Sequence, residues 1–290
     1  MFRDFSGFRV VPLGLGGVTR KIVLEDGGGS LLILKFAKDK LGILIKDYLC
    51  EYVGSSMAKL LGYPVQEVEL GYYEGEECAA VKMFSHTLVS FKGLGTSSAD
   101  GVKVGSKGEN YNLQWLLDLE MKQGKFKLTQ EQYINWVWQV FMLDMFIGNF
   151  DRHEGNWGFF YERGGYTPAP LYDNGACFYP KLIDTAQMNM SDGEMRNLVE
   201  FQTKCAIIYK GKKKAFFEIM NLVLKEETAS REFRAFIKKV DETDFQPIFD
   251  YLIQYNKKYN DTIKFIKRVF NCRRELLRRY ESSGYSAGFA

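Results

Sequence analysis

The spacing of apolar and polar positions changes character about a third of the way along the chain. Before residue 92, short apolar runs alternate with glycine-rich turns, which predicts strands at 8–11, 21–25, 31–36, 65–73 and 78–84. One segment, residues 45–62, instead has apolar residues at helical spacing and ends at Gly62. The pattern therefore predicts a small sheet accompanied by one helix.

Beyond residue 110 the apolar period becomes helical. Helices are expected at 112–122 and at 129–147, where Thr129 is suited to cap the first turn. Further helices are expected at 193–208, 212–225, 228–239, 243–255 and 257–281. We therefore expect an α+β protein with a β-rich N-terminal lobe, a mobile connector rich in Gly, Ser and charge, and a helical C-terminal lobe, covering residues 1–91, 92–110 and 111–290.

Composition and charge exclude several classes of protein. A net charge of +3 is too small to predict direct nucleic-acid binding. The most apolar stretch, 136–150, is interrupted by Asp144 and Asn149, so no integral membrane association is expected. The five cysteines are widely spaced without metal-ligand spacing, and the N-terminus lacks a secretory pattern. We expect a cytoplasmic protein with reduced cysteines.

Charge gathers in IGNFDRHEGNWGFF, residues 147–160, between two apolar segments. Here Asp151 precedes Asn156 with four residues between them, and Asp173 follows in APLYDNG. Phosphoryl transfer needs a carboxylate to orient the attacking hydroxyl and oxygen ligands for Mg²⁺. The spacing is typical of kinases, with Asp151 as the base and Asn156 and Asp173 as metal ligands. Alone it is a weak pattern, and the alternative is that Asp151 is an ordinary turn residue.

Upstream features favour the catalytic interpretation. Lys35 is the one cation in LLILKFA and is costly to bury unless it is paired. Glu51, in the predicted helix, is suited to form the ion pair that positions ATP phosphates. The alternative is that Lys35 extends to solvent at a sheet edge and Glu51 faces water. Between two predicted strands, GLGGVTRK offers a glycine hairpin over the phosphates, formed by Gly14, Gly16 and Gly17.

These motifs resemble those of the HipA-like serine/threonine kinases, in particular their short, CtkA-like form. GNFDRHEGNWGF, APLYDNGACFYP, LKFA and GLGGVTRK carry the resemblance, which spans about residues 10–180 and fades after Pro180. It implies a protein-kinase-like two-lobed fold with ATP and Mg²⁺ between the lobes. It also implies that Lys82 to Phe84 form the hinge whose backbone holds adenine. From the length of 290 residues we expect the additional N-terminal domain of full-length HipA toxins to be missing.

Two departures from the family pattern stand out. DNG replaces the usual DFG triplet, so a switch driven by a phenylalanine is not expected. The glycine loop contains Thr19 but lacks a counterpart of the serine that regulates some HipA toxins. In the central motif, we expect His153 to brace the turn and Trp157 and Phe159 to anchor it in the core. Arg152 is left open between an ion pair and solvent.

We therefore expect an ATP- and Mg²⁺-dependent kinase that phosphorylates an unidentified protein, with autophosphorylation and an antitoxin-type partner as further expectations. Two alternatives remain open. One is a phosphoinositide or small-molecule kinase, because the DRH…N loop is similar to theirs and the C-terminal helix is basic. The other is a catalytically silent binding subunit of a toxin–antitoxin system.

Overall fold

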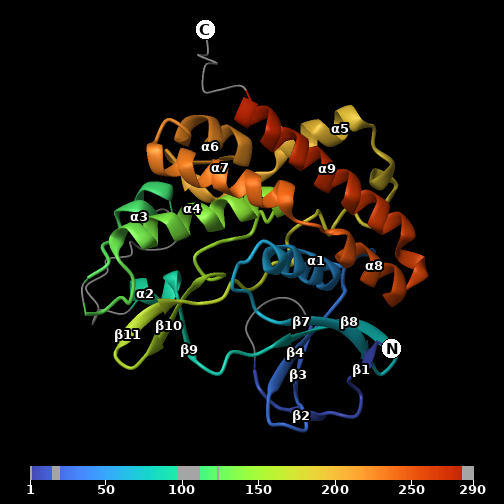
Figure 1. The fold of residues 1–290 in the computed structure, drawn as a ribbon. Coiled ribbons are helices and arrows are strands. Elements are labelled where there is room, and N and C mark those ends of the chain that lie inside the picture. The colour runs from blue at the N-terminus through green and yellow to red at the C-terminus, as the bar shows by residue number, and fades with distance from the viewer. Residues whose placement is uncertain (1, 15–19, 97–111, 123, 283–290) are drawn as a thin grey trace. The chain divides into compact units, whose positions relative to one another are not determined.

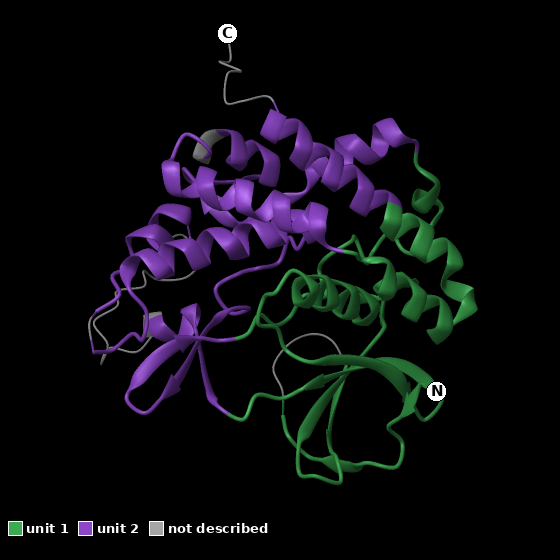
Figure 2. Cartoon of the chain, in the orientation of Figure 1, with its two compact units in different colours: residues 1–85, 170–190, 244–267 green, residues 86–169, 191–243, 268–290 purple. Residues whose placement is uncertain are grey.

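The computed structural model describes residues 2–14, 20–96, 112–122 and 124–282 (Figure 1). Contacts between residues divide the chain into two compact units, each assembled from separated segments (Figure 2). Unit 1 comprises residues 1–85, 170–190 and 244–267, and unit 2 comprises residues 86–169, 191–243 and 268–290. The lobe boundaries expected at residues 91 and 110 stay a prediction.

Within the described residues, unit 1 contains a six-stranded sheet in the order β1-β7-β8-β4-β3-β2. Strands β1 and β7 pair in parallel, and the other neighbours pair antiparallel. The strands are β1 (Arg3–Asp4), β2 (Arg9–Val11), β3 (Lys21–Glu25), β4 (Leu31–Phe36), β7 (Val68–Tyr73) and β8 (Glu76–Lys82), with a separate hairpin of β5 (Lys38–Lys40) and β6 (Ile43–Ile45). The strands predicted in this region are therefore confirmed.

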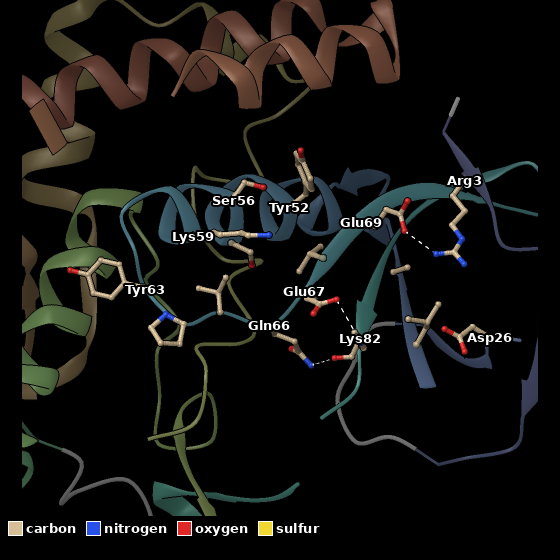
Figure 3. A pocket seen from close by; sticks show the side chains of 16 residues that line it. Arg3, Asp26, Tyr52, Ser56, Lys59, Tyr63, Gln66, Glu67, Glu69 and Lys82 are labelled. Atoms are coloured by element: carbon tan, nitrogen blue, oxygen red, sulfur yellow. Dashed lines mark hydrogen bonds and ion pairs between the residues drawn. The ribbon is translucent and has the colours of Figure 1, made fainter. Parts of the chain in front are cut away.

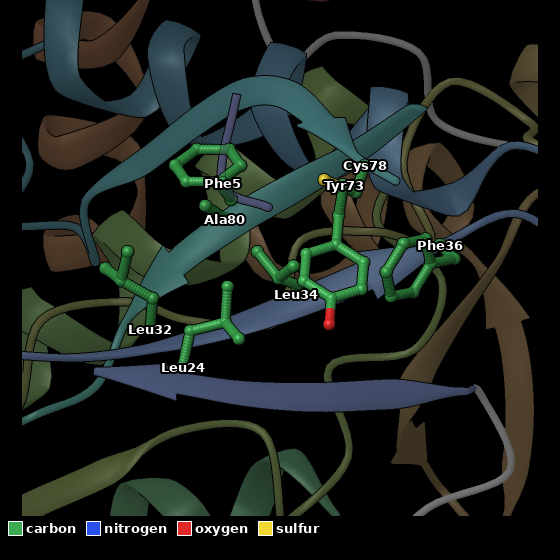
Figure 4. Packing of buried hydrophobic residues seen from close by; sticks show 8 residues of the cluster. All are labelled: Phe5, Leu24, Leu32, Leu34, Phe36, Tyr73, Cys78 and Ala80. Carbon is green, nitrogen blue, oxygen red and sulfur yellow. The ribbon is translucent and has the colours of Figure 1, made fainter. Parts of the chain in front are cut away.

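Side chains alternate across strand β4. Leu32, Leu34 and Phe36 are buried in an apolar cluster with Phe5 and other residues of the sheet (Figure 4). Because successive side chains of a strand point to opposite faces, Lys35 lies on the face away from this cluster. Helix α1 (Asp47–Leu60) packs against β4, β7 and β8.

The remaining helical parts of unit 1 come from late in the sequence. They are the 3₁₀ turns η1 (Ala186–Asn189) and η3 (Lys257–Tyr259), helix α8 (Gln246–Tyr255) and the first part of α9 (Asn260–Ser282). Helix α8 contacts α1. A segment near the C-terminal end of the sequence thus supports the helix next to the N-terminal sheet.

Unit 2 is mainly helical. Its helices are α2 (Phe91–Thr96), α3 (Leu113–Asp118), α4 (Gln130–Ile147), α5 (Asp192–Asn197), the π-helical turn η2 (Leu198–Gln202), α6 (Phe216–Val223), α7 (Glu227–Glu242) and the rest of α9. Thr129 caps α4 through a reciprocal pair of hydrogen bonds with Gln132, which confirms the predicted helix start. The α+β class is therefore confirmed.

Two predictions in unit 2 were wrong. The helix predicted over 193–208 ends in the π-helical turn, and β12 (Lys204–Tyr209) then pairs with β13 (Lys212–Ala215) in the segment predicted as the start of the next helix. The pair is joined by Lys210 and Gly211 with φ of 47° and 75°, a turn that favours a hairpin. A second small sheet joins β9 (Thr87–Ser90), β10 (Gly158–Glu162) and β11 (Gly165–Pro168).

Other expectations fare differently. The connector predicted from residue 92 begins within α2, so that part was wrong, and residues 97–110 lie outside the described residues. All five cysteines are free thiols, as predicted. Among the described helices, none combines the length and apolarity needed to cross a membrane.

Candidate active site

Lys35, Glu51 and Asp173 meet in unit 1. The Nζ atom of Lys35 lies 2.8 Å from Oε2 of Glu51 on α1 and 2.8 Å from Oδ1 of Asp173. The side chain of Glu51 is 1% exposed, whereas that of Asp173 is 48% exposed. The lysine ammonium therefore joins a buried carboxylate to one that solvent or a ligand can reach.

The charge state of Lys35 follows from these neighbours. Burial by itself lowers the pKa of an ammonium group, but the carboxylates of Glu51 and Asp173 raise the pKa of Lys35 well above its ordinary value. Lys35 is consequently a fixed positive charge at neutral pH. A fixed cation beside an accessible carboxylate is suited to hold an anionic ligand such as a phosphate group.

The DNG segment is fastened to α1 by its asparagine. The backbone N–H of Asn174 donates to Oε1 of Glu51 at 2.9 Å, and its Nδ2 donates to Oγ of Ser55 at 2.9 Å. A Cβ atom on Gly54 would lie 2.7 Å from Sγ of Cys177, so glycine permits this close approach. Asp173 itself has φ of 58°, a strained conformation for a residue other than glycine.

Sequence reasoning did not identify Asn174 or Ser55 as site residues. Asn174 is fully buried, and it contacts a residue 123 positions earlier in the chain. Its position directly after Asp173 could have identified it. In DNG an amide stands where DFG has an apolar phenylalanine, and a buried amide needs hydrogen-bond partners.

The charged turn after α4 lies in unit 2 and presents Asp151. The backbone N–H of Asp151 donates to Oδ1 of Asn149 at 3.2 Å, and its carbonyl accepts from Nδ2 of Asn156 at 2.8 Å. The side chain of Asp151 is exposed, whereas Asn156 is buried. The turn therefore fixes the backbone of Asp151 and leaves its carboxylate accessible.

A buried ion pair supports this turn. Arg152 donates from Nε to Oδ2 of Asp144 at 2.9 Å and from Nη2 to Oδ1 at 3.0 Å, and its Nη1 donates to the carbonyl of Asn156 at 2.8 Å. Burial raises the pKa of Asp144, while Arg152 and Asn149 oppose that shift. Asp144 and Asn149, which interrupt the apolar stretch in the sequence, thus connect α4 to the turn, and Arg152 forms an ion pair.

The end of α4 is also shaped by Gly148 and Arg273. Gly148 has φ of 70°, and a Cβ atom there would lie 2.4 Å from Nη2 of Arg273. Arg273 is fully buried and donates to the carbonyl of Met145. One of the basic residues of the C-terminal helix therefore belongs to the support of the charged turn, not to a solvated surface.

The neighbours of Asp151 have the structural contacts expected for them. Nδ1 of His153 accepts a hydrogen bond from the backbone of Gly155 at 3.0 Å. Trp157 and Phe159 are buried against Phe91. His153 thus braces the turn, and the two aromatic residues anchor it in the core.

The predicted hinge, Lys82 to Phe84, lies at the end of β8 in unit 1. The N–H of Lys82 donates to the carbonyl of Glu67 at 3.0 Å, and its carbonyl accepts from Nε2 of Gln66 at 2.8 Å. Since a carbonyl oxygen has two lone pairs but an amide has one hydrogen, Lys82 retains only acceptor capacity for a base. The ring of Phe84 contacts that of Tyr172 at 5.8 Å between centroids.

The side chain of Lys82 lines a hollow of about 680 Å³ in unit 1 (Figure 3). Tyr52, Ser56 and Lys59 of α1 form one wall of it. Two ion pairs cross its other side, Lys82 with Glu67 and Arg3 with Glu69. The described residues that line the hollow do not include Lys35, Glu51 or Asp173, so it is separate from that set.

The remaining predicted ligand residues are the three glycines of the hairpin and the two metal ligands. Gly14 is described, and a Cβ atom there would meet no atom within 4 Å, whereas Gly16 and Gly17 lie outside the described residues. Asn156 and Asp173 offer amide and carboxylate oxygens, the hard donors that Mg²⁺ prefers. Mg²⁺ commonly takes one or two protein ligands and completes its shell with water and phosphate, so each of these side chains is of a type that suits the ion.

Comparison with known proteins agrees with the resemblance. The model of the HipA-like C-terminal domain family matches residues 13–244, so the likeness extends well beyond Pro180, where it was expected to fade. The serine/threonine-protein kinase CtkA of Helicobacter pylori is 32% identical over 197 residues, which are 62% of this chain. The matched region spans 57% of the length of CtkA.

Solved structures share the fold. The crystal structure of the H. pylori proinflammatory kinase CtkA matches with a TM-score of 0.76 at 20% identity, covering 99% of this chain and 100% of that one. HipA of Shewanella oneidensis MR-1, solved with HipB and operator DNA, matches with a TM-score of 0.56 at 15% identity. The match covers 93% of this chain and 65% of the HipA chain. The chain belongs to the family of HipA-like C-terminal domains.

Proposed function

We propose that this chain is an ATP- and Mg²⁺-dependent kinase that transfers the γ-phosphate of ATP to a serine or threonine hydroxyl of a protein. The observation that carries the proposal is the placement of Lys35 between Glu51 and Asp173. Family membership and the name of its relative CtkA, a serine/threonine-protein kinase, support it.

The residues of unit 1 bind and orient the nucleotide in this proposal. Glu51 holds the ammonium of Lys35 in place, and Lys35 contacts the ATP phosphates. The glycine segment at Gly14, Gly16 and Gly17 covers those phosphates, and the backbone from Lys82 to Phe84 holds adenine. Asp173 would be a ligand of the metal ion, which would neutralise charge that develops on the phosphates, and Asn156 of unit 2 stays the other predicted ligand.

Asp151 accepts the proton of the acceptor hydroxyl and orients its oxygen toward the phosphate. Its exposed side chain on a fixed backbone suits this role, because a general base must reach a substrate without losing its position. Arg152 and Asp144 act indirectly by holding the turn.

The decisive experiment compares Asp151→Asn with wild type. The variant is expected to bind ATP with unchanged affinity in calorimetry but to transfer labelled phosphate about 10²-fold or more slowly, the usual contribution of a general base. Glu154→Gln is the matched control, since it changes another carboxylate of the same turn. Undiminished transfer by Asp151→Asn would remove Asp151 from the mechanism.

The acceptor is tested with two parallel substrates, a protein mixture and phosphoinositide vesicles. Phosphorylated protein identified by mass spectrometry, and absent with Asp151→Asn, supports a protein kinase. Labelled lipid alone would instead assign a lipid kinase. A catalytically silent subunit would show no Mg²⁺-dependent ATP binding sensitive to Asp173→Ala.

A further inference from the structure

A carboxylate in unit 1 that has no part in the proposed chemistry collects an unusual number of donors. Glu77, the second residue of β8, accepts through Oε2 from the hydroxyl of Tyr48 at 3.0 Å and from that of Tyr259. Its Oε1 accepts from Nδ2 of Asn256 and from Nζ of Lys258, both at 2.9 Å. The two tyrosine hydroxyls lie 2.7 Å apart. Helix α1, strand β8 and the turn after α8 therefore meet at one side chain.

This junction is largely shielded from water. Tyr48 and Tyr259 are at most 1% exposed, and the side chain of Glu77 is 14% exposed. Burial by itself raises the pKa of Glu77, but hydrogen bonds from Tyr259, Lys258, Asn256 and Tyr48 outweigh it and lower that pKa. Glu77 is therefore ionised at neutral pH, and hydrogen bonds to an ionised acceptor are stronger than neutral ones.

Stacked tyrosines extend the contact along α1. The rings of Tyr52 and Tyr251 lie 5.0 Å apart, those of Tyr72 and Tyr255 5.6 Å, and those of Tyr255 and Tyr259 5.9 Å. Tyr251 and Tyr255 lie four residues apart in α8 and therefore on one side of that helix, and Tyr259 follows in η3. The late segment thus contacts α1 and the sheet along several turns.

We propose that Glu77, Tyr48 and Tyr259 are positioning residues for the Lys35–Glu51 pair. Tyr48 lies three positions before Glu51, so the two side chains project from adjacent turns of α1 on neighbouring parts of its surface. Holding the Tyr48 hydroxyl fixes the rotation of α1, and that rotation decides whether Glu51 reaches Lys35. The inference rests on the proposed function for its catalytic meaning, but the positioning itself does not need phosphoryl transfer.

Other contacts of α1 act at different points, including the hydrogen bond that the backbone of Asn174 donates to Glu51 itself. At its N-terminal end, Lys46 pairs with Asp184 and Lys38 pairs with Asp47. Those ion pairs fix the end of the helix, whereas the Glu77 junction acts one turn from Glu51. Removing the junction is therefore expected to loosen Glu51 without unfolding the sheet.

The test measures the acylation rate of Lys35 by peptide mass spectrometry without ATP, relative to exposed Lys204 of unit 2. When the contact with Glu51 opens, the Nζ atom of Lys35 becomes more accessible to the reagent, so its relative acylation rate rises. Glu77→Ala is expected to raise that relative rate several-fold, and Tyr48→Phe and Tyr259→Phe to raise it less. Glu77→Gln, which keeps one acceptor oxygen, should restore part of the protection.

Tyr280→Phe is the matched control, because it removes a hydroxyl that contacts Glu200 in unit 2. An unchanged Lys35 rate in Glu77→Ala, with native circular dichroism, would overturn the positioning role. If Glu77→Ala fails to fold, Tyr259→Phe and Glu77→Gln decide in its place. A Lys35 rate that responds in a chain without kinase activity would retain the positioning role and reject the proposed function.

Discussion

The two units hold charged groups in opposite ways. In unit 1 Lys35 bridges a buried and a half-exposed carboxylate, so one side of the network is open to solvent. In unit 2 the pair of Asp144 and Arg152 is almost completely buried, and the exposed Asp151 is held through its backbone. The most deeply buried charges are therefore not the ones proposed to react. In unit 2 they fix the backbone that presents Asp151, the proposed base.

Breaking the buried ion pair of Asp144 and Arg152 should give the largest loss of stability. Arg152→Met leaves Asp144 as an unpaired buried charge, which typically costs about 3–5 kcal/mol. We expect urea unfolding to show that loss of stability, with loss of activity following from it. The double variant Asp144→Leu/Arg152→Met should recover most of the stability. If the single variant unfolds like wild type, the pair does not support the turn.

Removing the cation of the Lys35, Glu51 and Asp173 network should affect activity more than stability. Lys35→Met is expected to slow phosphoryl transfer about 10²–10³-fold, as removal of one charge-stabilising group typically does. Stability should also fall, because the buried Glu51 loses its cation, but by less than in Arg152→Met, because Glu51 keeps the hydrogen bond from Asn174 and Asp173 remains in contact with solvent. Steady-state kinetics and urea unfolding of the same preparations give both quantities. A larger stability loss than Arg152→Met would contradict the contrast between the units.

The contact of the DNG segment with α1 should have a smaller effect. Asn174→Leu removes the side-chain bond to Ser55 and leaves a buried hydroxyl without that donor, at a cost of about 1–3 kcal/mol. Ser55→Ala in the same background should recover part of it in thermal unfolding. Strict additivity of the two substitutions would show that the amide and the hydroxyl do not interact.

The smallest effect concerns alkaline pH. Because the folded pKa of Lys35 is raised, its contribution to stability is present in full below the unfolded value of 10.5 and is lost as pH rises through the folded value. Wild type and Lys35→Met should therefore differ by a constant amount from neutral pH to about pH 10 and converge above it. If wild type and Lys35→Met instead reached the same stability near pH 8, the ammonium of Lys35 would not be held by Glu51 and Asp173.

Local patterns predicted the elements that depend on neighbouring residues. The helix expected at 45–62 is α1, and the cap at Thr129 starts α4. The helix expected at 193–208 was wrong because Cys205 to Ile207 are buried in a strand that pairs with β13 and contacts α3 and α6, which a local period does not reveal.

The site shows the same division. The types and order of Lys35, Glu51 and Asp173 could be predicted because phosphate chemistry demands them. Most partners of Asn174 and Glu77 could not be predicted, because Ser55 lies 119 positions from Asn174 and Tyr259 lies 182 positions from Glu77. The roles of Asp151 and Asn156 stay predictions until the variants are measured.

The late origin of the segment around Tyr259 has a consequence for biosynthesis. Tyr48 and Tyr259 are separated by 211 positions, so a ribosome must make that whole stretch before they can meet. Because contacts so distant in sequence form late, unit 1 completes its support of α1 only after the segment around Tyr259 has been made. A nascent chain arrested at residue 243 should therefore leave Lys35 easily acylated, and the proposed activity would be withheld until that segment is synthesised.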